Sequence, residues 1–387
     1  MRVLGLPLDF VNLRSESYSS SSRIPTVSFG TATSDAMRRD FTVNSLFFNV
    51  SNCTVEDLTG KGIEDLREGV MRTPLEPLVT FLDDPLRVLR MIRFSARFGF
   101  DIHPPLIEAA KDESVHEALG EKVSRERIGT ELEGMFTGRD ADPSRALRTM
   151  ERCGLLEVVY RLPDVDAEGG GEGTGRESEK LKWREGFEGA MRVSGVVGED
   201  SRIDERLLYL LTLLRGFRGE KHPDKKIKLV TSYVIRESLK WKNSDVDTVA
   251  TVLEVLEDVG EVVGEVSEGD LRNWGDCRVR EMRVKVGMLL RTLKSMWITA
   301  VALSIIHRNL VGTDAFHKFM NFTEVTLELR DIWKVKSKIG GKEIVGVLGV
   351  KKGPQVGVYS NEAVKFELRY PEKGKDEVLD FLRHFKE

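Results

Sequence analysis

Apolar residues recur every three or four positions along most of the chain beyond Pro85. This spacing places them on one face of an α-helix, so the pattern predicts a series of amphipathic helices. Pro104-Pro105 separates two of these helices, and another is expected from Pro143 to its stop at Gly154. A second helical region follows from about residue 180, and its strongest apolar face consists of Leu207, Leu208, Leu210, Leu211 and Leu214.

The first 75 residues or so follow a different pattern, in which short β-rich runs alternate with turns. Asp9 stands between apolar neighbours, as expected of a residue that points out of a half-buried strand. The serine-rich stretch Ser15 to Ser22 is expected to form a loop. The fold class predicted is therefore α+β, with a partial sheet followed by mostly helical structure.

Composition limits the kind of protein this can be. With 387 residues and 40% hydrophobic content the chain can form more than one domain with real cores, and Pro163 to Gly175 reads as a glycine-rich linker. The longest apolar run, Trp297 to Ile306, is shorter than the roughly 20 residues that span a bilayer and predicts a core helix, with no membrane involvement. The cysteines have neither disulfide nor metal-site spacing and indicate an intracellular, reducing compartment: Cys53, Cys153 and Cys277.

The net charge of −4 hides an uneven distribution. Between Lys221 and Lys242, seven lysines and arginines stand against Asp224 and Glu237, and the segment also contains Tyr233 and Trp241. Such a segment can follow an RNA backbone and stack on a base or sugar. It can equally be a solvated helix face with Trp241 in the core.

Two charged clusters carry the candidate chemistry. The first, Arg38-Arg39-Asp40, borders an apolar segment and suits phosphate oxygens and a ribose hydroxyl. The second runs from Asp83 to Phe94, where a helix with an acidic first turn is expected to project Asp84, Arg87 and Arg90 from successive turns.

An aspartate beside an arginine offers an acceptor next to a fork of donors. Cytosine and adenine both present an exocyclic amine beside a ring nitrogen acceptor, so Asp84 and Arg87 can read either base. Uracil and guanine reverse that pattern, at a cost of roughly 1–3 kcal/mol for each hydrogen bond left unmade. The pair therefore predicts selection of C and A without a nucleic-acid template.

At these residues the chain resembles the class II, eukaryotic-type CCA-adding tRNA nucleotidyltransferases. Arg38 to Asn44 is similar to the ribose and triphosphate motif of that family, and Asp83 to Arg90 is similar to its base-reading motif. Glu56 to Pro74 resembles the hinge between head and neck, and Ser124 to Arg127 with Glu131 resembles the motif that buttresses the neck helices.

The resemblance implies a partial nucleotidyltransferase head of the polymerase-β-like type at residues 1–75. A helical neck at 76–160 would read the base and bind RNA, and a helical body at 161–300 would follow. A helical, tRNA-binding tail at 301–387 is expected, because Gly346 to Gly357 looks like the segment that meets the tRNA elbow. From residue 330 to the end, thirteen lysines and arginines stand against nine aspartates and glutamates.

The chain departs from the family at one important point. Family members begin with a Gly-Gly-x-x-Arg-Asp loop and an Asp-x-Asp strand whose carboxylates bind the catalytic metal ions, and neither occurs before Asp40. We therefore expect a natural protein that is longer than this chain, with a shortened, non-catalytic product as the alternative. Magnesium is implied by the family's reaction although its principal ligands are missing, and Asp9 is at most a supporting acid.

The function that follows from the resemblance is addition of C, C and A to tRNA 3′ ends from CTP and ATP. Arg38 and Arg39 would hold the triphosphate, with Asn44 in the same motif. Asp40 would hold the ribose, Asp84 and Arg87 the base, and Arg90 would orient the base-reading pair or contact phosphate. The alternatives are a poly(A) polymerase of the same superfamily and a non-catalytic RNA- or nucleotide-binding fragment.

Overall fold

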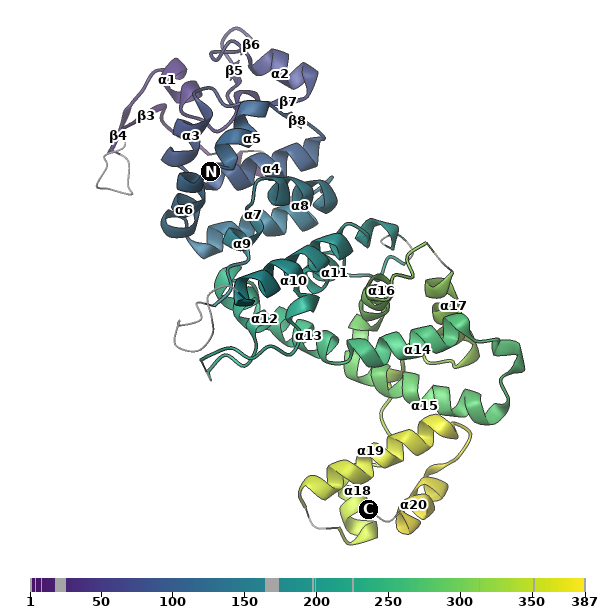
Figure 1. The fold of residues 1–387 in the computed structure, drawn as a ribbon. Coiled ribbons are helices and arrows are strands. Elements are labelled where there is room, and N and C mark those ends of the chain that lie inside the picture. Colours follow the sequence, from purple (N-terminus) through teal and green to yellow (C-terminus); the bar gives the residue numbers. More distant parts are fainter. Residues whose placement is uncertain are drawn as a thin grey trace. The chain divides into compact units, whose positions relative to one another are not determined.

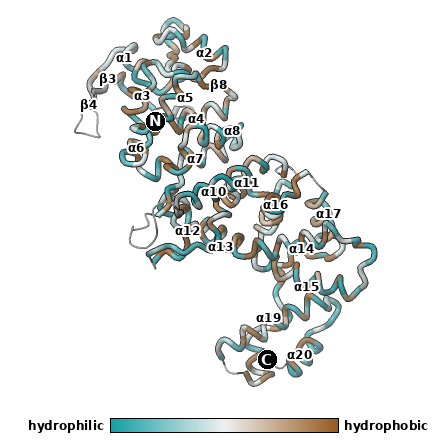
Figure 2. Tube along the Cα trace, in the orientation of Figure 1, coloured by the Kyte–Doolittle hydropathy of each residue, from teal (hydrophilic) through white to brown (hydrophobic). Residues whose placement is uncertain are grey.

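The computed structural model describes residues 2–3, 5–7, 9–17, 26–163, 174–196, 198, 200–224, 226–312, 314–350 and 352–385. They belong to two compact units, residues 1–166 with 221–243, and residues 167–220 with 244–387. The described chain is mostly helical with a few short strands near its beginning, which confirms the predicted α+β class (Figure 1). Figure 2 shows apolar and polar residues alternating along most helices, as the amphipathic pattern predicts.

The strands among the described residues of the first unit form four separate pairs. Three pairs are antiparallel: β1 (Arg2–Val3) with β2 (Leu6–Pro7), β3 (Arg14–Ser17) with β4 (Thr26–Phe29), and β5 (Phe47–Asn49) with β6 (Thr54–Glu56). The fourth pair, β7 (Val70–Met71) with β8 (Asp101–Ile102), is parallel.

Two local expectations for this region are wrong. Asp9 lies in an exposed, irregular segment after β2 and not on a half-buried strand, because Gly5 with φ +81° turns the chain and Pro7 lacks a ladder donor. The start of the serine-rich stretch is strand β3, whose ladder pairs Ser17 with Thr26, so it is not loop throughout. The remainder of that stretch, residues 18–22, lies outside the described residues.

The first unit contains ten α-helices among its described residues. They are α1 (Ala32–Met37), α2 (Gly62–Glu68), α3 (Pro77–Asp83), α4 (Leu86–Phe98), α5 (Pro104–Ala110), α6 (Glu113–Lys122), α7 (Arg125–Thr137), α8 (Pro143–Arg152), α9 (Leu156–Val159) and α12 (Val230–Tyr233). Helix α4 packs against α7 and α8, and its buried face includes Leu89, Met91 and Ile92. The predicted stop of α8 is confirmed, since Gly154 has φ +70°.

Residues 221–243 belong to the first unit although the residues on both sides of them belong to the second. This returning segment is fastened to α7. The indole Nε1 of Trp241 donates to the carbonyl oxygen of Gly129 at 3.1 Å, and the Arg125 guanidinium donates to the carbonyl of Ser238 at 2.7 Å. The ring of Trp241 also meets Phe136 edge-on at 6.4 Å. Trp241 is half-buried and packs against α7.

Burial gives Arg125 an unusual environment. Its guanidinium also donates to the carbonyls of Val158 and Val159, so one side chain joins α7, the end of α9 and the returning segment. Removal from water lowers the pKa of Arg125 to about 10, which leaves it charged at neutral pH. Within the Ser124–Arg127 motif, Arg125 thus joins three segments of the first unit.

The second unit is helical among its described residues. Its α-helices are α10 (Thr174–Ala190), α11 (Glu205–Leu214), α13 (Asn243–Glu254), α14 (Leu256–Glu268), α15 (Asp276–Leu293), α16 (Trp297–His307), α17 (Ala315–Asn321), α18 (Gly341–Leu348), α19 (Pro354–Arg369) and α20 (Lys375–His384). Helix α11 is buried from Leu207 to Leu214, and the last three helices enclose a small core of their own around Ile344 and Val378.

One helical stretch, Asp276–His307, is long and apolar enough to cross a membrane by length and composition alone. Of its most apolar window, 67% is buried inside the structure. In α16 every residue from Trp297 to Ile306 is buried, as expected of a core helix. The stretch is therefore weak support for a membrane span.

Candidate functional site

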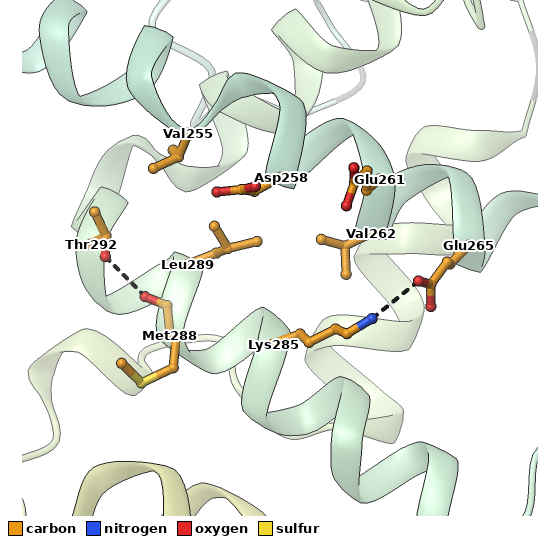
Figure 3. Close-up of a pocket in the computed structure, with 9 residues that line it drawn as sticks. All are labelled: Val255, Asp258, Glu261, Val262, Glu265, Lys285, Met288, Leu289 and Thr292. Carbon is orange, nitrogen blue, oxygen red and sulfur yellow. Dashed lines mark hydrogen bonds and ion pairs between the residues drawn. The ribbon is translucent and has the colours of Figure 1, made fainter. Parts of the chain in front are cut away.

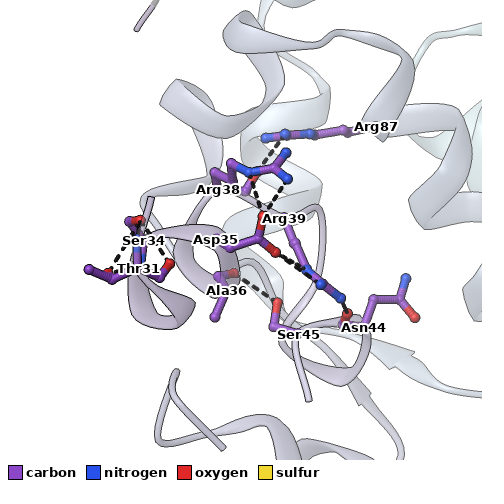
Figure 4. A network of polar contacts seen from close by, with 9 residues as sticks. All are labelled: Thr31, Ser34, Asp35, Ala36, Arg38, Arg39, Asn44, Ser45 and Arg87. Carbon is purple, nitrogen blue, oxygen red and sulfur yellow. Dashed lines mark hydrogen bonds and ion pairs between the residues drawn. The ribbon is translucent and has the colours of Figure 1, made fainter. Parts of the chain in front are cut away.

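A buried carboxylate holds the two arginines of the first cluster together (Figure 4). Asp35, on α1, is 3% exposed, and its Oδ1 accepts hydrogen bonds from Arg38 at 2.5 and 3.1 Å. Its Oδ2 accepts two more from Arg39 at 2.9 and 3.1 Å. This carboxylate thus holds two cations side by side on a half-buried surface, an arrangement that suits an anionic ligand.

Arg39 also connects this cluster to the residues that follow it. Its Nη1 donates to the carbonyl oxygen of Asn44 at 2.8 Å, and its guanidinium lies 4.7 Å from the centre of the Phe47 ring. Contacts on both sides hold the planar group in one orientation, so its outer N–H groups are presented in a fixed geometry.

Asp40 forms the link between the two charged clusters. It is 9% exposed, and its Oδ2 accepts from Arg90 of α4 at 2.8 Å (Nε) and 2.7 Å (Nη2). Its Oδ1 accepts from the amide of Phe41 at 2.9 Å and from the side chain of Asn44 at 3.2 Å. Four donors already occupy this carboxylate, about the number that it can accept. The predicted ribose contact would have to share these acceptors.

Arg90 lies between two acids. Beside Asp40, its Nη1 is 3.6 Å from an oxygen of Glu131 on α7, and Glu131 is also paired with Arg93 at 2.6 Å. Burial acts to lower the pKa of Arg90, but the neighbouring carboxylates, Asp40 foremost and then Glu131 and Asp84, together outweigh it and the pKa is raised. Two cations and two anions balance here, so this part of the network fixes α4 against α7.

Arg87 reaches across to the first cluster from the first turn of α4. Its Nη2 donates to the carbonyl oxygen of Arg38 at 2.6 Å and its Nη1 to the carbonyl of Thr80 at 3.4 Å (Figure 4). The side chain that the sequence assigns to the base therefore supports the backbone of the residue assigned to the triphosphate.

Asp84 does not lie on the helix where the sequence placed it. It follows α3 with φ −137° and ψ 96°, and α4 begins only at Leu86. The cause is Pro85, whose ring disfavours helical geometry in the preceding residue. The Asp84 carboxylate accepts from Arg127 of α7 at 3.2 Å, and its backbone carbonyl accepts from the amide of Arg87 at 3.0 Å. Asp84 and Arg87 are thus adjacent through the backbone, with side chains that have different partners.

The segment predicted as a hinge is tied to the same site. Buried Asp65 accepts from the hydroxyl of Thr42 at 2.7 Å and from Arg72 at 3.1 Å. Gly62 lies so close to Thr42 that an added Cβ would be 2.7 Å from its carbonyl oxygen. The backbone that follows Asp40 is therefore fixed by contacts with α2 and with Arg72, the residue after β7.

The sequence analysis did not identify Asp35, and it did not predict that Arg127 pairs with Asp84. The spacing of Asp35 to Arg38 and Arg39, three and four residues apart, was a usable signal once a helix was expected there. Arg127 lies 43 residues from Asp84, so only the fold brings these two side chains together.

The described residues do not form a metal centre. No group of three or more histidine, cysteine, aspartate or glutamate side chains among them could hold an ion. Asp9 is exposed, whereas Asp35 and Asp40 are buried and paired with arginines. These carboxylates do not fit the paired-metal arrangement that nucleotidyl transfer requires.

The second unit contains a groove of about 400 Å³ between α14 and α15 (Figure 3). Its floor is apolar, with Val262 and Leu289, and its rim carries Asp258, Glu261 and Glu265. Lys285, on the facing helix, is paired with Glu265 at 3.2 Å. Because the rim is acidic, the groove would repel phosphates, and the arginine cluster of the first unit is the better nucleotide site.

The chain is similar to several known proteins. Residues 2–72 match the family model of the poly A polymerase head domain. The mitochondrial CCA tRNA nucleotidyltransferase of Saccharomyces cerevisiae is 30% identical over 99% of this chain and 74% of its own length. The tRNA nucleotidyltransferase cca2 of Schizosaccharomyces pombe is 30% identical over 100% of this chain and 78% of its own. The crystal structure of the Bacillus stearothermophilus CCA-adding enzyme in complex with CTP shares the fold, with a TM-score of 0.57, 19% identity and coverage of 92% of this chain and 75% of that one.

Proposed function

The chain belongs to the CCA tRNA nucleotidyltransferases, and from this premise we propose that it takes CTP and ATP as substrates and adds C, C and A to tRNA 3′ ends. The observation that carries the proposal is the likeness along nearly the whole chain to relatives named for that activity. In the structure, the paired arginine cluster and the adjacent Asp84 and Arg87 also support the proposal.

Arg38 and Arg39 would bind the triphosphate. The Asp35 carboxylate holds both guanidinium groups in place. Because their positions are set before the nucleotide arrives, less side-chain entropy is lost on binding. In this arrangement Asp35 is a positioning residue, and Asn44 completes the motif by bonding Arg39 and Asp40.

Asp84 and Arg87 would read the base. Asp84 supplies an acceptor for the exocyclic amine of C or A, and Arg87 supplies donors for the ring nitrogen beside it. Each side chain already has a partner, Arg127 for Asp84 and the Arg38 carbonyl for Arg87. A base would therefore have to replace or share these contacts, and only a base with the matching pattern compensates for them.

Arg90 would orient this pair from α4, and the ion pair with Asp40 fixes Arg90 in turn. The chemical step in this family is attack of the tRNA 3′-hydroxyl on the α-phosphate with release of pyrophosphate. Magnesium is implied for this chemistry by the family alone. The described residues do not supply its ligands, and Asp9 alone is a supporting acid at most.

The test is incorporation of labelled CTP and ATP into a tRNA that lacks CCA. The double variant Asp84→Ala, Arg87→Ala is compared with Glu108→Ala, Lys111→Ala, an exposed ion pair with the same spacing of three residues. We expect the first variant to lose addition of C and A and the control to retain it. Equal activity of both variants would contradict the assigned base-reading site.

The same assay separates the alternatives. Processive incorporation of ATP with neglect of CTP would indicate a poly(A) polymerase. Binding of tRNA without incorporation of either nucleotide would indicate a non-catalytic RNA-binding protein. As for its place of action, we propose the inside of the cell, since the S. cerevisiae relative is a mitochondrial enzyme.

A further inference from the structure

The returning segment carries a cluster of cations that the nucleotide site does not use. In its first part, Lys221, Lys226 and Lys228 are exposed, and no ion pair to a carboxylate is recorded for their described side chains. Asp224 is the acidic residue among them, and Lys225 lies outside the described residues. In the second part, Glu237 already pairs with Lys240 at 2.7 Å and with Arg236 at 3.4 Å. The excess of positive charge is thus concentrated in the first part.

The backbone of this part is a closed loop. Lys221 and Leu229 form an antiparallel bridge, and the amide of His222 donates to the carbonyl of Lys228 at 3.2 Å. In an antiparallel pair, residues opposite each other point to the same face, so Lys228 lies on the face of His222. Closure fixes the two ends of the loop and keeps the lysines together on a short stretch of surface.

An aromatic pair lies beside the lysines. The imidazole of His222 stacks on the ring of Tyr233 at 4.9 Å with an angle of 28° between the planes. The His222 Nδ1 accepts from the amide of Asp224 at 2.9 Å, while its Nε2 is buried and has no recorded partner. Both rings are half-buried, so the pair is fixed by the fold and still reaches the surface.

Exposed lysines next to fixed aromatic rings are the groups that contact an RNA backbone and its sugars. We propose that Lys221, Lys226 and Lys228, with Tyr233, form an RNA-binding surface that contacts phosphates of the tRNA outside the nucleotide site. This inference rests on the proposed function, because it takes tRNA as the partner. The acidic groove of the second unit, lined by Asp258 and Glu261, has the opposite charge and does not fit this partner.

The loop is firmly attached to the rest of the first unit. The returning segment is held by Trp241 on Gly129 and by Ser238, whose hydroxyl donates to the carbonyl of Arg161. A phosphate bound by the loop would therefore be held at a fixed distance from α7, whose Arg127 pairs with Asp84. The surface thus gives tRNA a fixed attachment to the unit that contains the nucleotide site.

The experiment measures the Kd of labelled tRNA lacking CCA at several salt concentrations. The triple variant K221A/K226A/K228A is compared with wild type and with K61A/K182A/K285A, three lysines that are paired with acids and lie outside the segments expected to bind RNA. Each phosphate contact contributes roughly 0.7–0.9 to the slope of log Kd against log salt concentration. The slope measured for the loop variant should therefore be smaller than that of wild type by about two. The control should keep the slope of wild type, and the arginine variant K221R/K226R/K228R should restore it.

A slope equal to that of wild type in the loop variant would overturn the inference, while leaving the proposed function intact if wild type still adds CCA. Loss of CTP binding together with tRNA binding would also overturn it, because it would indicate damage to the fold. Failure of wild type to bind tRNA at all would overturn this inference and the proposed function together.

Discussion

The close approach of α7 to the returning segment gives the sharpest prediction for stability. Gly129 lies inside α7, and a Cβ added there would be 1.9 Å from the carbonyl oxygen of Leu239 and 2.9 Å from its carbonyl carbon. Backbone atoms cannot rotate away, so Gly129→Ala must separate the two segments by about 1 Å or more. Gly120, in α6, is the matched control, since the nearest atom to an added Cβ is a Val158 methyl at 4.0 Å.

The magnitude follows from three contributions. Overpacking of this kind typically costs about 1–3 kcal/mol. Separation also weakens the bonds from Trp241 to Gly129 and from Arg125 to Ser238, each worth about 1–3 kcal/mol at most. The higher helix propensity of alanine relative to glycine offsets about 0.5–1 kcal/mol of this loss in stability. The net loss for Gly129→Ala is therefore about 2–4 kcal/mol, whereas Gly120→Ala should gain up to about 1 kcal/mol.

Thermal unfolding followed by circular dichroism measures both changes, and fluorescence of Trp241 reports on the contact itself. For a unit of this size, about 1 kcal/mol corresponds to roughly 2–4 °C in Tm. We expect Gly129→Ala to lower Tm by about 5–15 °C and Gly120→Ala to raise it slightly. An unchanged or higher Tm for Gly129→Ala would refute the packing of Leu239 on α7 that the structure shows.

Three further outcomes follow from the site. Asp35→Asn should raise the KM for CTP and ATP about tenfold with a smaller change in kcat, since the arginine clamp loses about 1–2 kcal/mol; steady-state kinetics with equal KM values would contradict this. Arg127→Met, which removes the partner of Asp84, should reduce discrimination between CTP and UTP while Tm stays within a few degrees, and competition assays measure it. Burial acts to raise the pKa of Asp57, but hydrogen bonds from Ile63 and Thr59 outweigh it, so the pKa in the folded protein is lowered. The ionised carboxylate therefore stabilises the fold at pH values above its unfolded pKa, and this stabilisation is lost as the pH falls through the lower folded pKa. Asp57→Asn should therefore be less stable than wild type at pH 7, with the difference shrinking below about pH 4 in denaturant titrations.

Local patterns in the sequence predicted the helices well. The spacing of leucines anticipated buried α11, and Pro143 with Gly154 marked both ends of α8. These features depend on residues close together in the chain, where periodicity and turn chemistry act directly. The same local logic explains one error, because a rule about the residue before proline would have kept Asp84 out of α4.

Contacts between distant residues could not be predicted from such patterns. Arg90 and Asp40 are 50 residues apart, and the pairing of Arg127 with Asp84 spans 43. The sequence showed which arginines and acids were present but not which acid each arginine pairs with, because the fold alone sets the distances between these side chains. Around Asp9 the sequence has the alternation typical of a β-strand, but in the structure Asp9 does not belong to a strand.

The bond from Arg87 to the carbonyl oxygen of Arg38 has an energetic consequence for the proposed enzyme. A base that draws the Arg87 guanidinium away takes a charged donor from the backbone of Arg38. Base and phosphate recognition then share a coupling free energy, and such coupling is reciprocal. Pyrophosphate, which engages only the arginine cluster, should therefore bind with an affinity that depends on whether C, A or no base occupies the neighbouring subsite.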